Sequence, residues 1–265
     1  METPRRTRTI LLAGFTVWVA TLTGVYYAVS SQRLIFVAIG LSGVVAILVG
    51  VVVNRPAGRM PWLLLAAANL SFTAGEATQI VLIQFLHEDP FPSLADAFYL
   101  ATYALYAAGL LGFVRWRTSR RDQAGLIDAL TLTAGLALLI WIYVIVPYAQ
   151  TPGLSWIQKA ISIAYPLGDI LVLAMLLRLL ALRGGKSVSL LLLTGGTIGL
   201  LASDVAYALI QLNGTWRTGT VVDLGWAVFY GAWGAAALHP SMTTLTKPVA
   251  AASPETARGR SQRVR

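Results

Sequence analysis

The sequence predicts an all-α integral membrane protein, a bundle of eight transmembrane helices built as two parallel four-helix repeats with both termini cytoplasmic. Hydrophobic residues make up 57% of the 265 residues and charged residues only 12%, which is about half the charge of an ordinary soluble domain. Apolar segments long enough to cross a hydrocarbon core of about 30 Å recur along the whole chain. This composition excludes a soluble enzyme or a disordered regulator. It makes the lipid bilayer the expected partner of most of the surface.

Eight segments have the length and apolar character of transmembrane helices. They cover 9–29, 34–53, 61–86, 93–114, 124–146, 156–182, 187–212 and 219–238. The first follows Arg5, Arg6 and Arg8, as in a signal peptide cleaved near Ala28 or Ser30. Because its apolar stretch is longer than that of a signal peptide, the sequence favours a membrane anchor.

The distribution of Lys and Arg predicts the orientation. If the chain starts inside, 17 of these residues fall on the inner side and three, Arg33, Lys159 and Arg217, fall outside. Cytoplasmic loops of membrane proteins carry such an excess, so we expect both termini in the cytoplasm. The same segregation accounts for the net charge of +9, and a nucleic-acid partner is not needed to explain it.

The ends of the chain are expected to lie outside the bundle. Residues 1–8 form a cytoplasmic amino terminus, and residues 9–238 form the transmembrane domain. Residues 239–265 are rich in Ala, Ser, Pro, Thr and Arg and have little apolar material to bury. This composition predicts a disordered, basic cytoplasmic tail.

Polar residues recur at nearly one offset in the two halves of the chain. The pairs are Asp96 with Asp223, Gln84 with Gln211, Arg59 with Lys186, and Glu76 with Asp204. The separation is identical in the first three pairs and a single position longer in the last. This offset predicts two repeats of the same orientation, 9–114 and 124–238, as in some transporters. The alternative is a chance alignment of low-complexity membrane helices, and the first and fifth segments fit the repeat worst.

Each repeat carries a column of aromatic residues behind a carboxylate. The columns are Asp96, Tyr99, Tyr103 and Tyr106 in the fourth segment, and Asp223, Trp226, Tyr230 and Trp233 in the eighth. Steps of three, four and three positions keep each column on one helix face. Such a stripe is typical of helix packing. The carboxylate at its outer end makes a ligand site the alternative.

Glu76, Asp169 and Asp204 lie well inside their segments. A carboxylate in a membrane helix costs roughly 2.5 to 3.5 kcal/mol on insertion scales, so such residues normally face the bundle interior. We interpret the acids as part of an outward-facing acidic and aromatic pocket that binds a cation, a proton or a small polar ligand. The alternative is interhelical hydrogen bonding that only fixes the packing. The expected pocket residues are Glu76, Asp96, Tyr99, Tyr103, Asp169, Asp204, Tyr207, Asp223, Trp226 and Tyr230.

The sequence carries no recognisable catalytic or cofactor motif. It has no cysteine, no HExxH, GxSxG, Walker or GxGxxG signature, and no lysine deep in a predicted helix for a retinal Schiff base. Its two histidines, His87 and His239, are expected on opposite sides of the membrane, where they cannot clamp one haem. His87, Glu88 and Asp89 could bind a metal, although adjacent residues in such a loop are usually solvated. We therefore expect no cofactor and no catalysis, with a membrane enzyme as the third alternative.

Four strings point to a family: FPSLADAFYLATYALYAAGLL at 91–111, YPLGDILVLA at 165–174, SDVAYAL at 203–209 and DLGWAVFYGAWGAAALHPSM at 223–242. They resemble the amino-terminal multi-pass membrane regions of actinobacterial GGDEF and GGDEF-EAL proteins, the cyclases and phosphodiesterases of cyclic di-GMP turnover. The resemblance implies a membrane input module in which Asp96, Asp169, Asp204 and Asp223 are family-like positions. No GGDEF or EAL motif occurs, so cyclase activity is not implied. We expect an isolated module or a fragment of a longer protein.

These observations predict a non-catalytic sensory or regulatory module in the bacterial cytoplasmic membrane. Its expected partners are a small extracellular ligand or cation, and a cytoplasmic signalling protein or a second copy of the chain. The alternative is a small transporter or channel coupled to a cation or a proton.

Overall fold

The computed structural model describes residues 5–29, 33–88, 90–118, 123–182, 186–214 and 217–247. Within these ranges all regular structure is helical. The α-helices are α1 (Arg5–Ala28), α2 (Arg33–Asn54), α3 (Met60–Ile80), α4 (Leu94–Arg117), α5 (Gln123–Ile140), α6 (Val146–Gln150), α7 (Trp156–Ala181), α8 (Val188–Leu212) and α9 (Val221–Leu238). The π-helical segments η1 (Val81–Phe85) and η2 (Trp141–Ile145) continue α3 and join α5 to α6, and the 3-10 helix η3 (Pro240–Thr246) follows α9.

Helices occupy each of the eight segments in which the sequence predicts them. Among the described residues, seven helical stretches are long and apolar enough to cross a membrane, so the chain is a multi-pass helical membrane protein. Of the helices in the eight predicted segments, α3 is the one that is not apolar enough to be among these seven. Its hydropathy is lowered by Asn69, Thr73 and Glu76, together with other polar residues. α3 packs between α2 and α4, so these polar groups can face protein instead of lipid.

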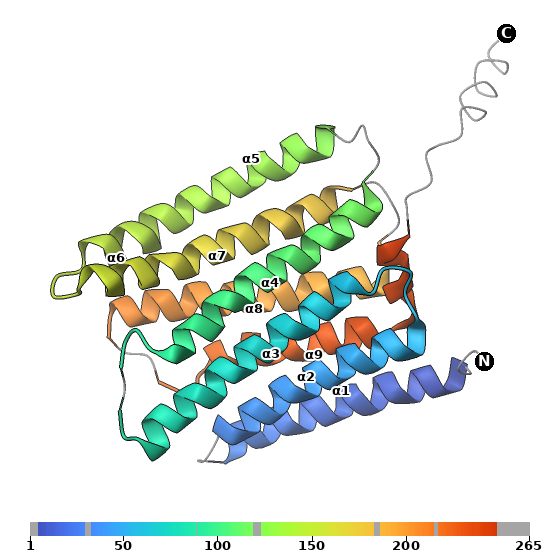
Figure 1. Cartoon of the computed structure of the whole chain (residues 1–265), viewed down its shortest axis with the longest axis horizontal. Helices are drawn as coiled ribbons and strands as arrows, with labels where there is room; N and C mark the ends of the chain where they lie inside the picture. Colours follow the sequence, from blue (N-terminus) through green and yellow to red (C-terminus); the bar gives the residue numbers. More distant parts are fainter. Residues whose placement is uncertain are drawn as a thin grey trace, which may run out of the picture.

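The helices lie side by side with their long axes roughly aligned (Figure 1). α1 forms one edge of the bundle, where it contacts α2 and α9, and α5 forms the opposite edge, where it contacts α7. The start of α1 and η3 lie at the same end of the bundle (Figure 1). The chain between these two points therefore runs an even number of times along the bundle.

The centre of the bundle consists of two tightly packed helix pairs, α3 with α4 and α8 with α9. α2 packs on α9, and α7 packs on α4. Large aromatic side chains fill the interior, where Trp62, Tyr106, Phe229, Tyr230 and Trp233 are fully buried. Rings of this size bury much apolar area and hold neighbouring helices in a defined arrangement.

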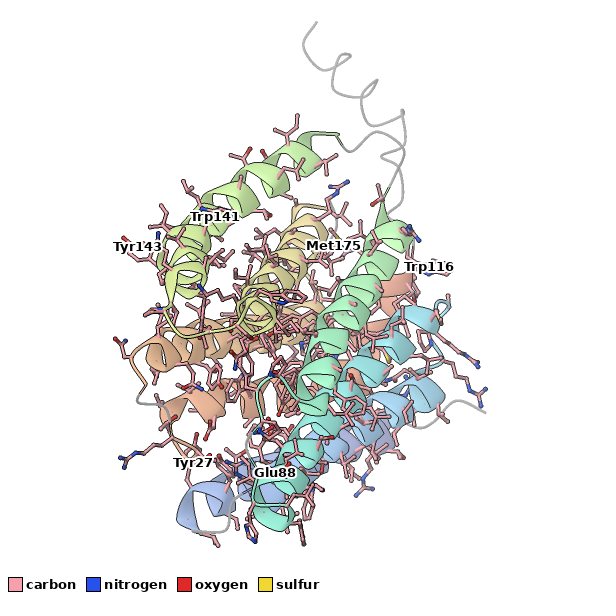
Figure 2. All side chains as sticks on the ribbon, turned by 60° about the vertical axis from the view of Figure 1, so that its left-hand side comes forward. Tyr27, Glu88, Trp116, Trp141, Tyr143 and Met175 are labelled. Carbon is pink, nitrogen blue, oxygen red and sulfur yellow. The ribbon has the colours of Figure 1, made fainter. Side chains whose placement is uncertain are left out.

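Pro147 coincides with the change in helix type between α5 and α6. A proline has no backbone N–H to donate to the carbonyl four residues earlier, and the chain forms the π-helix η2 just before this residue. Trp141 and Tyr143 on η2 point away from the bundle (Figure 2) and are 53% and 63% exposed. In a membrane these two side chains contact lipid.

The sequence predicts a disordered tail from residue 239, and this boundary is wrong. The chain continues directly into η3, whose Met242 and Leu245 are fully buried. Their spacing of three positions places them on one side of a 3-10 helix, and η3 contacts α4, α8 and α9. The remainder of the predicted tail, 248–265, lies outside the described residues.

Candidate functional site

Asp204 in α8 accepts hydrogen bonds from side chains of other helices. Tyr103 of α4 donates its hydroxyl to Oδ2 at 2.9 Å, and Trp226 of α9 donates its indole N–H to Oδ1 at 2.7 Å. The carboxyl group of Asp169, on α7, is also hydrogen-bonded to that of Asp204. One carboxyl group therefore links α4, α7, α8 and α9.

Asp169 is the more deeply buried member of this carboxyl pair, with 3% of its surface exposed. A hydrogen bond between two carboxyl groups requires a proton on one of them, because an ionised carboxylate can only accept. Oδ1 of Asp169 is buried, and no hydrogen-bond donor is paired with it. Gly168 makes room beside it for Tyr103, since a Cβ at this glycine would lie 2.6 Å from Cγ of the ring.

Glu76 in α3 is held in the same manner as Asp204. Tyr99 of α4 donates its hydroxyl to Oε1 of Glu76 at 3.0 Å. Under the repeat offset, Glu76 corresponds to Asp204 within one position, and Tyr99 corresponds to Trp226. In both halves of the chain, an aromatic donor on one helix holds the acid of the helix before it.

The next aromatic residue of each column crosses to the other half of the chain. Tyr103 reaches from α4 to α8, and its counterpart Tyr230 reaches from α9 to α3, where its hydroxyl lies 3.4 Å from Oγ1 of Thr73. Tyr106 and Trp233, which are also equivalent under the repeat offset, contact each other with ring centroids separated by 4.0 Å. The two halves of the chain meet at these residues.

Asp96 and Asp223 lie in the first turns of α4 and α9 and cap these helices. Asp96 Oδ2 accepts from the backbone N–H of Ser93 at 2.6 Å, and Asp223 Oδ2 accepts from that of Gly219 at 2.6 Å. A carboxylate at this position also interacts favourably with the helix dipole. Helix capping accounts for both acids without a ligand.

Each capping acid also binds a tyrosine of another helix. Tyr165 of α7 donates to Asp96 Oδ1 at 2.7 Å, and Tyr26 of α1 donates to Asp223 Oδ2 at 2.6 Å. These bonds attach α7 to the start of α4 and α1 to the start of α9. The predicted site residues therefore also hold the bundle together.

The predicted site residues fall into several groups. Asp169, Asp204, Tyr103 and Trp226 form one, and Tyr207 joins it by packing on Trp226 with a centroid separation of 5.9 Å. Glu76 and Tyr99 form another, and the ring of Phe72 lies between the two groups, 5.2 Å from Tyr99 and 6.4 Å from Trp226. Glu76 and Asp204 are both partly exposed. A single ligand pocket shared by these groups stays a prediction.

Tyr165 and Tyr26 were not among the predicted site residues. Tyr165 precedes Asp169 by four positions, so helical spacing could have placed it on the same face. Ser93 likewise precedes Asp96 by three positions, which resembles the spacing of a capping box. By contrast, Tyr26 and its partner are 197 residues apart, and no local pattern connects them.

The two ends of the bundle carry different groups. Tyr27 and Glu88 lie at the end opposite to Trp116 (Figure 2). Arg33, at the start of α2, acts electrostatically on both Glu76 and Asp223. The sequence predicts Arg33 only as a residue of an outer loop. Its distance from these acids depends on how α2 packs against the other helices, which no local pattern reveals.

His239 lies between α9 and η3, outside the membrane-spanning helices. Its Nδ1 accepts from the backbone N–H of Ser241 at 3.1 Å, and burial lowers the pKa of the imidazole. A neutral ring is required for this acceptor role, because both nitrogens of a protonated ring are donors. His239 thus has a local role in starting η3.

No group of three His, Asp or Glu side chains in the described part of the chain is arranged to hold a metal ion. Asp89, one of the three loop residues considered for a metal, lies outside that part. No family model, curated protein or solved structure matches the chain.

Proposed function

We propose that this protein is a non-catalytic sensory module of a bacterial membrane, of the kind that precedes GGDEF output domains. A small cation, proton or polar ligand arriving from the outer side changes the charge or hydration of the carboxyl groups in the interior. The helices then shift against one another, and a cytoplasmic partner reads this shift at the inner ends of the helices.

The observation that carries this proposal is the set of bonds to Asp204. Its carboxyl group is bound by Tyr103 of α4, Trp226 of α9 and Asp169 of α7. Any change in the charge of this group alters bonds to three other helices at once. A charge change at one residue can thereby bias the packing of a two-state helix bundle.

The proposed topology has eight crossings with both termini in the cytoplasm. The segregation of Lys and Arg supports it, as does the position of η3 at the same end as the start of α1 (Figure 1). α3 is the eighth crossing, because a helix enclosed by α2 and α4 does not need a fully apolar surface.

The proposed architecture is a pair of parallel repeats. α2, α3 and α4 of the first half correspond to α7, α8 and α9 of the second at the repeat offset. The pairs α3–α4 and α8–α9 are equivalent under this relation, and so are the contacts α2–α9 and α7–α4. This agreement between sequence offset and helix contacts supports a duplication over a chance alignment.

Spin labels can measure the proposed helix movement, because the chain contains no cysteine. Arg59→Cys and Lys186→Cys place labels at exposed positions at the starts of α3 and α8. The purified protein in lipid nanodiscs is tested with a pH step, with sodium against choline, and with methylammonium. We expect the label-to-label distance distribution to shift in at least one of these conditions.

Asp204→Asn should abolish the shift. Asp128→Asn is the matched control, because Asp128 is an exposed acid on α5, and it should leave the shift unchanged. A distance distribution that stays constant in all conditions, or a shift that survives in Asp204→Asn, contradicts the sensory proposal.

A transporter is the second candidate, favoured by the equivalent placement of Glu76 and Asp204 in the two halves. Both acids are partly exposed and bound by an aromatic donor, and parallel repeats with binding sites near the midplane occur in transporters. Proteoliposomes loaded with a pH-sensitive dye separate the two candidates. Proton or sodium-coupled flux that Asp204→Asn removes supports transport, whereas helix movement without flux supports sensing.

A further inference from the structure

The carboxyl pair of Asp169 and Asp204 differs from the other acids of the bundle. Asp96 and Asp223 are bound by backbone N–H groups and tyrosine hydroxyls, and Glu76 is bound by Tyr99 with Arg33 within electrostatic reach. Asp169 instead has a second acid, Asp204, among its hydrogen-bond partners, together with Tyr103. Two neighbouring carboxylates cannot both stay ionised in an environment of low polarity.

The first half of the chain has no acid at the position equivalent to Asp169. Under the offset that relates Asp223 to Asp96, Asp169 corresponds to Ser42 in α2, which has no ionisable group. The repeat therefore does not require an acid at this position for packing. The extra acid stands beside Asp204, where the four helices α4, α7, α8 and α9 converge.

A second observation points to a small ligand at the pair. Oδ1 of Asp169 is buried and has no hydrogen-bond partner, and the hydroxyl of the fully buried Tyr106 also has none. Unpaired polar atoms in a buried site carry a free-energy cost, which a bound proton or water molecule can lower. Tyr106 interacts electrostatically with Asp204. Asp169 is hydrogen-bonded to Asp204.

The groups around the pair are neutral donors. The tyrosines that interact electrostatically with the pair are Tyr103 and Tyr106 on α4 and Tyr165 on α7. Trp226 faces the pair from α9. The main interactions of the two carboxyl groups are with each other, with Tyr103 and with Trp226. One proton on the pair would remove the repulsion between two adjacent carboxylates.

We propose that Asp169 and Asp204 form a binding site for one proton, which they share, and that this proton is the species to which the sensory module responds. The second half of this statement rests on the proposed function. In the one-proton state, the protonated carboxyl of Asp169 donates to Asp204, which keeps α7 bound to α8. Loss of the proton to water leaves two carboxylates that repel each other, and α7 separates from α8.

Infrared spectroscopy tests the proton directly, because a protonated carboxyl group has a C=O stretch that a carboxylate lacks. We expect wild-type protein in nanodiscs to show this band at neutral pH and to lose it reversibly at alkaline pH. Asp169→Asn and Asp204→Asn should each remove the same component of the band. Glu76→Gln is the matched control and should retain that component.

Isotope labelling keeps the test valid if a variant fails to fold. Aspartate labelled with carbon-13 in its side-chain carboxyl shifts the band of a protonated aspartic acid in the wild-type protein, and it leaves a glutamic acid band in place. A band that does not shift, a band that both Asp variants retain, or the absence of any protonated carboxyl at neutral pH overturns the shared proton.

The spin-label experiment separates this inference from the proposed function. An aspartic acid band that titrates, together with a label-to-label distance that is constant at every pH, supports the proton site. The same result contradicts the proposal that the proton is the signal. A distance that responds to sodium or methylammonium, in protein without the band, supports the sensory function and defeats the proton site.

Discussion

At the scale of single residues, the acids of this bundle are held mainly by neutral donors. Tyrosine hydroxyls bind Glu76, Asp96, Asp204 and Asp223, and the indole of Trp226 also binds Asp204. A neutral donor stabilises a buried acid without the cost of taking a second charge out of water. It also leaves the acid free to gain or lose a proton without breaking an ion pair.

The indole of Trp226 should contribute measurably to stability. Trp226→Phe keeps most of the ring volume and removes the N–H that donates to Asp204 at 2.7 Å. We expect a loss of about 1 to 3 kcal/mol in the free energy of unfolding, because Oδ1 of Asp204 loses its donor inside the bundle. Thermal unfolding in detergent measures the change. Trp141→Phe, at a 53% exposed tryptophan on η2, is the control and should have a smaller effect.

Gly168 should be required for the position of Tyr103. In Gly168→Ala the added methyl group would lie 2.6 Å from the ring, so Tyr103 must move away from Asp204. Overpacking of this kind costs about 1 to 3 kcal/mol. Gly195→Ala is the matched control on α8, where nothing lies within 4 Å of the new Cβ. Equal melting temperatures for the two variants would show that the contact is unimportant.

At the scale of elements, helix ends are where the sequence places its strongest local signals. Ser93 caps α4 and Ser155 caps α7, and in each case the residue three positions later bonds back to the backbone of the cap. η3 is another local element, started by His239 and anchored by Met242 and Leu245. It covers one end of the bundle, where it contacts α4, α8 and α9.

Met242 should therefore be a core residue. We expect Met242→Ala to lower the free energy of unfolding by about 2 to 5 kcal/mol, because it removes a fully buried side chain and leaves a cavity. Deletion of residues 248–265 is the control and should change the melting temperature little, since η3 remains. If the substitution is as mild as the deletion, η3 does not contribute to stability.

At the scale of the whole molecule, the bundle is organised around the junction of its two halves. Tyr103 and Tyr230 each cross from one half to the other, and Tyr106 contacts Trp233 at the junction. α1 and α5 lie at the two edges (Figure 1). Movement between the halves would therefore act first on the bonds of the central helices.

Reporter fusions test the number of crossings. Alkaline phosphatase and green fluorescent protein fused after Leu86, Val114, Leu212 and Leu238 should report outside, inside, outside and inside. The reason is the excess of Lys and Arg in the loops assigned to the cytoplasm. The first fusion is decisive for α3. An inside result after Leu86, with Asn54 also inside, would mean that α3 does not cross the membrane.

The membrane class and the positions of the long helices followed from the sequence by itself. Hydropathy and length are local quantities, and a bilayer imposes them on every segment that crosses it. The sequence also predicts the pairing of Glu76 with Asp204 and of Asp96 with Asp223 from their spacing along the chain, and the repeat behind this pairing stays a proposal. It did not reveal η3, since a short 3-10 helix has no long periodic pattern and is ordered mainly by burial of two side chains.

The partners of each acid were decided only by the tertiary structure. Tyr103 and Asp204 are 101 residues apart, and Tyr26 and Asp223 are 197 apart, so their contact depends on which helices become neighbours. The same holds for Asp169, which the sequence placed in a membrane helix without a partner. Helix packing brought it to Asp204, because side-chain shape across several helices determines which polar faces meet.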